Sequence, residues 1–93
     1  MENTWEETRN KYRMAVVHFA NRYNETVSEH IIDVMISTML TRDGVLQGGS
    51  FVDAIVTNNL KEAISRADAE CTKHLRIITL CANFCYAEHE MNV

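Results

Sequence analysis

The sequence predicts an all-α fold, a compact bundle of four to five helices, on the strength of three observations. The chain has no proline, and its three glycines all lie between residues 44 and 49, so the strongest helix breakers are confined to one short window. Apolar residues recur at intervals of three and four, without the alternation typical of strands. Capping residues precede the periodic stretches. We expect one domain, spanning residues 1–93.

The first helix is expected to begin at Thr4. Glu7 follows three residues later, and this spacing forms a capping box, in which each side chain accepts a hydrogen bond from a free backbone N–H group. The apolar stripe that follows consists of Trp5, Tyr12, Val16, Phe19, Ala20 and Tyr23. The polar stretch from Asn21 to Asn24 is expected to end the helix.

The second predicted helix is apolar over most of its circumference. Its start is assigned to a capping box of Thr26 and Glu29, and its end to a position near Arg42, where Asp43 and Gly44 follow. A helix of this kind is either central to a bundle or shared with a partner chain. On the second alternative we expect a homodimer or another partner. That partner face would be formed by Ile32, Met35, Ile36 and Met39.

A Gly-rich turn at 43–49 separates this helix from the next. Ser50 is the expected N-cap, with Asp53 in the first turn, where the helix dipole favours an acid. Asparagine prefers caps to helix interiors, so a break is expected near 58–59. Leu60 is expected to face the core.

Asp68 is expected to cap a last helix that runs to about Glu88. Its inward stripe consists of Cys71, His74, Ile78, Cys81 and Cys85. Cys81, Cys85 and His89 have a spacing from which one zinc ion can be bound. However, there is no C-x-x-C pair, and buried cysteine behaves as a small hydrophobic residue. We therefore expect three reduced, buried thiols, and neither a metal nor a cofactor.

Glycines before a helix can bind an anion through backbone N–H groups. Gly48, Gly49 and Ser50 form such a candidate site, with Arg42 or Arg66 as a source of positive charge. A phosphate-binding P-loop requires lysine directly after its last glycine, and Ser50 occupies that position. A simple turn between helices is the preferred interpretation, and an oligomer that binds a small ligand or nucleotide is kept as an alternative.

Arg13 and His18 have the R-x-x-x-x-H spacing. This spacing resembles the catalytic motif of HEPN-type ribonucleases, in which the pair handles the scissile phosphate. Nothing else in the sequence matches that family, and a packing or surface histidine is the alternative. We expect that the protein is not an enzyme, with a HEPN-like nuclease as the alternative.

Charge and hydropathy restrict the possible partners. The net charge is −4, and nine Lys and Arg residues are scattered among thirteen acidic ones, so no basic face for nucleic acid is evident. No apolar run approaches the roughly 18 residues of a membrane-spanning helix, and no signal peptide is recognisable at the N-terminus. A cytoplasmic protein is expected.

Residues 49–63 read GSFVDAIVTNNLKEA and are followed by Arg66, Ala67 and Asp68. This segment resembles one found in small uncharacterised bacteriophage proteins, in which an Asn-Asn or Asn-Asp-Leu break and an Arg-Ala-Asp sequence precede the final helix. Those proteins often close with a Pro and Trp-Gly segment, whereas this chain ends NFCYAEHEMNV. The resemblance implies a viral accessory protein, and it assigns no catalytic residue.

Such a protein, without a catalytic motif, is expected to bind and inhibit or redirect a host protein, for example a defence or transcription factor, in the host cytoplasm. A structural virion or assembly component is a further alternative.

Overall fold

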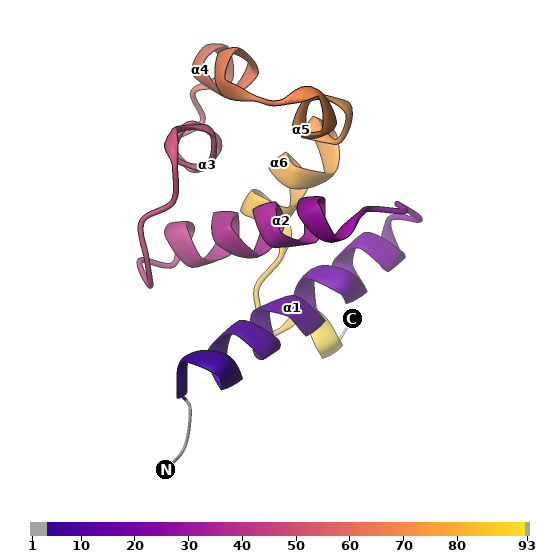
Figure 1. Cartoon of the computed structure of the whole chain (residues 1–93). Helices are drawn as coiled ribbons and strands as arrows, with labels where there is room; N and C mark the ends of the chain where they lie inside the picture. The colour runs from indigo at the N-terminus through magenta and orange to yellow at the C-terminus, as the bar shows by residue number, and fades with distance from the viewer. Residues whose placement is uncertain (1–3, 93) are drawn as a thin grey trace.

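The structure, a computed structural model, describes residues 4–92. These residues contain six α-helices and one 3₁₀ helix (Figure 1). They are α1 (Thr4–Arg22), α2 (Glu29–Arg42), α3 (Ser50–Val56), α4 (Leu60–Arg66), α5 (Ala69–Lys73), α6 (Leu75–Phe84) and η1 (Glu90–Asn92). These residues contain no strand, and the predicted all-α class is confirmed. The radius of gyration is 12.6 Å, close to the value of about 12 Å for a folded chain of this length.

Helix α2 is the centre of the fold. It packs against α1 on one side and against α3 and α6 on the other (Figure 1). The side chains suggested as a partner face are therefore core residues, because Ile32, Met35, Ile36 and Met39 are 8%, 0%, 3% and 0% exposed. This corrects the expectation of a partner surface on α2. Its apolar excess is covered by the same chain, so it no longer argues for a dimer.

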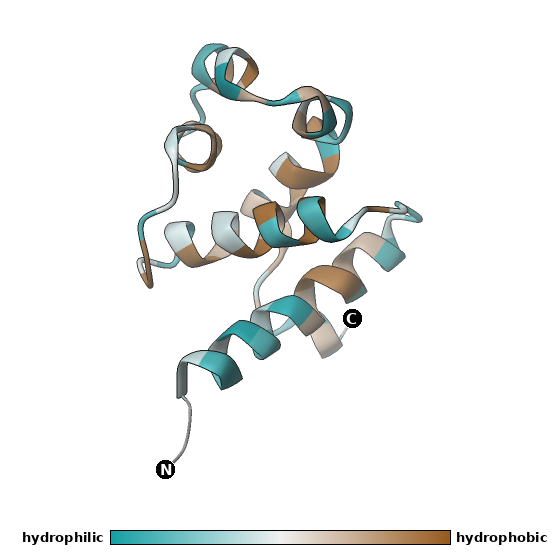
Figure 2. Ribbon diagram, viewed as in Figure 1, coloured by the Kyte–Doolittle hydropathy of each residue, from teal (hydrophilic) through white to brown (hydrophobic). Residues whose placement is uncertain are grey.

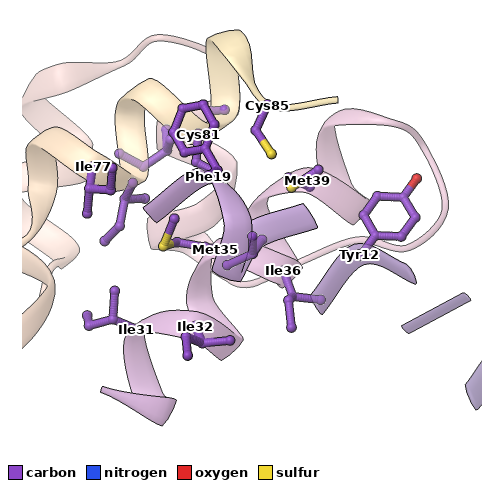
Figure 3. Packing of buried hydrophobic residues seen from close by; sticks show 14 of the residues in the cluster. Tyr12, Phe19, Ile31, Ile32, Met35, Ile36, Met39, Ile77, Cys81 and Cys85 are labelled. Atoms are coloured by element: carbon purple, nitrogen blue, oxygen red, sulfur yellow. The ribbon is translucent and has the colours of Figure 1, made fainter. Parts of the chain in front are cut away.

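The core forms where α1, α2 and α6 meet (Figure 3). Phe19 of α1, Met35 of α2 and Ile77 of α6 are fully buried there, and each contributes about 1.5–3 kcal/mol through removal of its side chain from water. Cys71, Cys81 and Cys85 are free and buried, as expected. Figure 2 shows that the first half of α1 is mainly hydrophilic, whereas hydrophobic residues lie along its second half.

The starts of α2 and α3 differ from the prediction. The N-cap of α2 is Ser28, whose hydroxyl oxygen accepts from the Ile31 N–H at 3.3 Å, and Thr26 lies outside the helix. The predicted capping box does not form, because Glu29 is the first residue of the helix rather than the third, and its carboxylate oxygens accept from the Arg13 guanidinium at 2.7 and 2.8 Å. At α3, Gly49 is the N-cap and provides no side-chain bond, while Ser50 is the first helical residue.

The described part of α1 begins at Thr4, but Thr4 is already helical, so it is not the expected N-cap, and the residues before it lie outside the described ones. The predicted ends at the asparagine-rich and glycine-rich segments are confirmed. Helix α1 ends at Arg22, and Gly44 has a left-handed φ of 77° just after α2.

The break at 58–59 is confirmed in detail. Asn58 has a left-handed φ of 60°, and the Asn59 side chain accepts from the Glu62 N–H at 3.2 Å, which caps α4. The inward position predicted for Leu60 is wrong, since this side chain is 62% exposed. Helix α4 turns only Ala63 fully inward, so Leu60, at its first position, remains on the surface.

The last predicted helix is two helices, which is why the number of helices exceeds five. Asp68 caps α5 as expected, with its Oδ1 accepting from the Cys71 N–H at 2.7 Å, but the chain changes direction at His74. Helix α6 then ends at Phe84 rather than near Glu88. Arg42, the last residue of α2, explains where α6 ends. Its Nη1 atom donates to the carbonyl oxygens of Ala82 and Cys85 at 3.1 and 2.6 Å. These bonds satisfy carbonyls that another helical turn would otherwise use.

Within the described residues, no helix combines the length and hydrophobicity that crossing a bilayer requires.

Candidate functional site

A hydrophobic pocket lies beneath α4. Its volume is about 220 Å³, and it is lined by Ala54, Ile55, Asn58, Asn59, Leu60, Ala63 and Thr79. These residues come from α3, from the turn that follows it, from α4 and from α6. An apolar cavity of ~150 Å³ is large enough to bind benzene, so this pocket has room for a large aliphatic or aromatic side chain.

The local sequence explains why the pocket forms. The left-handed Asn58 reverses the chain, and the Asn59 cap starts α4 directly afterwards, so α4 folds back over α3. Both helices place a small side chain in this region, Ala54 on α3 and Ala63 on α4, with 4% and 1% exposure. Alanines let the two backbones approach closely but leave space beside them unfilled.

Two large aliphatic side chains of α4 are exposed, and one of them, Leu60, lines the pocket. Leu60 and Ile64 are 62% and 52% exposed and lie four residues apart, on one face of α4. A single exposed apolar residue is ordinary, but two together beside an apolar pocket are typical of a binding surface. We call Leu60, Ile64 and the pocket the α4 surface. Sequence analysis missed it because a leucine after a break is equally compatible with core or surface.

A second site contains a buried carboxylate. Glu90 of η1 is 3% exposed, and it accepts from Arg22 Nε and Nη2 at 2.7 and 3.0 Å. Its Oε2 is also 2.8 Å from His18 Nδ1. Burial alone would raise the pKa of Glu90, but the hydrogen bonds from Arg22 and His18 outweigh it, so the pKa lies below its ordinary value. An ionised carboxylate can only accept hydrogen bonds, so the Nδ1 atom of His18 carries a hydrogen and donates a hydrogen bond to Glu90.

Arg13 and His18 line the same groove. The groove has a volume of about 460 Å³, is open to solvent and is completed by Met14, Val17, Asn21 and Met91. Both polar residues are already paired with carboxylates, Arg13 with Glu29 and His18 with Glu90. Among the described residues that line the groove, none is Ser, Thr or Cys, and the side chain suited to chemistry there is His18, as an acid or base.

The glycine-rich segment serves packing and turning. A Cβ atom on Gly48 would lie 2.8 Å from both Thr41 Oγ1 and Val52 Cγ1, so this position needs glycine for close approach. Gly49 and Ser50 share a hollow with Arg66, but Gly48 does not line it. Arg42 is committed to the end of α6. The structure thus brings Gly49, Ser50 and Arg66 of the candidate anion site together and leaves Gly48 and Arg42 outside the hollow.

The cysteine stripe of the last helix does not continue to His89. Cys81 and Cys85 are buried, and a hydrogen bond between them together with burial raises the pKa of Cys81 well above its ordinary value. His89 is exposed and lies beyond the end of α6, so the regular helical spacing is lost. Among the described residues, a different set, His30, Asp68 and Cys71, brings its potential ligand atoms within 4.8 Å of one another.

Neither a protein-family model nor a curated protein nor a solved structure matches this chain. The sites are therefore compared by their geometry. The Arg13 and His18 groove offers a positioned histidine beside the exposed Met14 and Met91, and the α4 surface leaves Leu60 and Ile64 in water with no charged residue among the described ones that line its pocket.

Proposed function

We propose that this protein acts by binding another protein through the α4 surface, without catalysis. The observation that supports this most is the exposure of Leu60 and Ile64 beside an apolar pocket of about 220 Å³. Covering each of these side chains contributes about 1.5–3 kcal/mol at most. An aromatic or aliphatic anchor of the partner, seated in the pocket, would complete an apolar centre of the kind that dominates protein interfaces.

The proposed partner is a host protein, and the proposed role is that of a phage accessory protein that inhibits or redirects it in the host cytoplasm. The segment that carries the resemblance to small phage proteins, residues 49–68, comprises α3, α4 and the cap of α5. It therefore contains all the residues of the α4 surface except Thr79. The proposal that the target is a defence or transcription factor rests on that resemblance.

A tagged chain used to capture proteins from a bacterial host lysate tests this proposal. We compare the wild type with Leu60→Asp/Ile64→Asp, and use Val45→Asp as the matched control, because Val45 is 48% exposed but lies in the turn after α2. The double variant should lose a stoichiometric partner that the wild type and the control retain, with unchanged circular dichroism. Equal capture by all three chains, or capture of no stoichiometric protein by the wild type, would contradict the proposal.

A nuclease is the second candidate, supported by the position of Arg13 and His18 in one groove. The buried Glu90 orients the His18 ring, which is the arrangement that a general acid or base requires. Arg13→Ala and His18→Ala should each abolish cleavage of RNA while leaving the fold intact. A wild-type protein without cleavage activity would eliminate this candidate.

A further inference from the structure

The start of α2 and the start of α5 bring together three side chains of metal-ligand type. His30 lies in the first turn of α2, Asp68 is the N-cap of α5, and Cys71 is three residues farther along. One potential ligand atom of each residue lies within 4.8 Å of the other two, and His30 Nε2 is 2.9 Å from Asp68 Oδ2. In the sequence His30 is far from the other two, so only the fold creates this cluster.

The surroundings leave space for an ion. The three residues line a hollow of about 290 Å³, together with Ser50, Phe51 and Arg66 among others. Cys71 is 3% exposed and lies at the buried side, whereas the His30 and Asp68 side chains are half exposed. An ion could thus enter from solvent and reach a thiol that water barely contacts.

The donor set selects the metal. Zinc binds cysteine sulfur, histidine nitrogen and aspartate oxygen at about 2.0–2.3 Å, whereas magnesium and calcium prefer oxygen ligands alone. A thiolate and a carboxylate together carry two negative charges, which balance a divalent ion. We propose that His30, Asp68 and Cys71 bind one zinc ion, with water completing the coordination.

The contacts already present are compatible with such an ion. Asp68 uses Oδ1 to cap α5 and Oδ2 to meet His30, so the capping bond can persist while Oδ2 binds the metal. The direct contact between His30 and Asp68 would be replaced by bonds to the metal. Two other charged groups adjoin the cluster, and each has a partner: Arg66 bonds Glu62, and Glu70 accepts from the Ser28 hydroxyl.

A bound ion would link the N-terminal ends of α2 and α5 and would stabilise the folded chain, because a metal that binds only the native state shifts the unfolding equilibrium. The experiment uses the full chain, freed of metal by a chelator. Zinc is titrated against a chromogenic competitor, and cobalt is used as a spectroscopic probe of thiolate coordination. We expect one zinc per chain, a higher melting temperature with zinc, and a cobalt–thiolate absorption band.

Variants assign the ligands. His30→Gln changes an exposed side chain and should weaken zinc binding at least ~10-fold, and Cys71→Ala should remove the cobalt–thiolate band. His89→Gln and Cys85→Ala, from the other cysteine and histidine set, are the matched controls and should bind like the wild type. Any of three results would overturn the proposal: no stoichiometric zinc, equal affinity in wild type and His30→Gln, or loss of binding in a control variant. His30→Gln keeps the test decisive if Cys71→Ala fails to fold.

Discussion

Replacement of the buried carboxylate in Glu90→Gln should destabilise the protein through loss of a hydrogen bond to α1. Glu90 accepts three bonds from charged or ring N–H groups, two from Arg22 and one from His18. Glutamine has nearly the same volume but only one acceptor oxygen, and its NH₂ group faces a donor. With its oxygen in the Oε2 position, glutamine can keep the bonds from Arg22 Nε and His18 Nδ1, and the bond from Arg22 Nη2 is lost.

The expected magnitude follows from burial. A hydrogen bond to a charged group contributes about 1.5–3 kcal/mol, so the one lost bond sets a range of about 1.5–3 kcal/mol. The side chains of His18 and Arg22 are 30% and 36% exposed, so water can hydrate part of what the variant leaves unpaired. We expect a net loss of about 2 kcal/mol, which lowers the melting temperature by about 10 °C in a domain of this size.

The dependence on pH gives a sharper readout. The folded-state pKa of Glu90 lies below its ordinary value of 4.5, so its stabilising contribution is complete above that pH and is lost as the pH falls through the folded-state pKa. The free-energy difference between wild type and Glu90→Gln, measured by urea unfolding, should be full at pH 7 and shrink below pH 4.5.

Glu88→Gln is the matched control for this experiment. Glu88 lies two residues earlier, is 71% exposed and pairs with Lys11 at the surface. Because exposed ion pairs contribute little, this variant should lose less than about 1 kcal/mol. The reasoning would be refuted if Glu90→Gln were no less stable than Glu88→Gln at pH 7, or if its deficit stayed constant down to pH 3.

Three further substitutions test other contacts by urea unfolding. Arg42→Lys should lower the free energy of unfolding by about 2 kcal/mol, because an ammonium group cannot form the guanidinium bonds to the end of α6 and to Asp43 at once. A loss below about 0.5 kcal/mol would contradict this role of Arg42. Gly48→Ala should lower the free energy of unfolding by about 1–3 kcal/mol, since the new methyl group would overlap Thr41 and Val52. An unchanged free energy of unfolding would show that these neighbours move aside without loss. Asn58→Ala should lower the free energy of unfolding by about 1 kcal/mol, because the backbone at residue 58 is left-handed, and Asn58→Gly should not lower it. Equal losses in the two variants would exclude backbone conformation as the cause.

Local chemistry made part of the fold predictable. Asp68 caps a helix, Gly44 ends one, and the Asn58-Asn59 pair separates two, because each effect depends on the residue and its immediate neighbours. The α2 start was placed two residues early because Thr26 and Ser28 are both competent caps. Glu29, whose spacing from Thr26 suggested the earlier start, is paired instead with Arg13 of another helix.

The candidate sites were less predictable, since they depend on which surfaces meet. The apolar pattern of α2 was recognised, but sequence alone cannot show that the same chain covers Met35 and Met39. No local pattern marks Glu90 as buried, and its burial arises from packing of η1 on α1. His30 meets Asp68 only in the folded chain, so no local spacing could have announced the proposed zinc site.

The bond between Arg22 and Glu90 also has a consequence for synthesis of the protein in the cell. The two residues are 68 positions apart. Because a ribosome adds roughly 5–20 residues per second, Glu90 is synthesised about 3–14 s after Arg22. During that time α1 can pair with α2, but the last segment that covers it is missing. Completion of this contact should therefore wait for synthesis of η1, and slow translation between Arg22 and Glu90 should prolong the exposure of α1 to proteases.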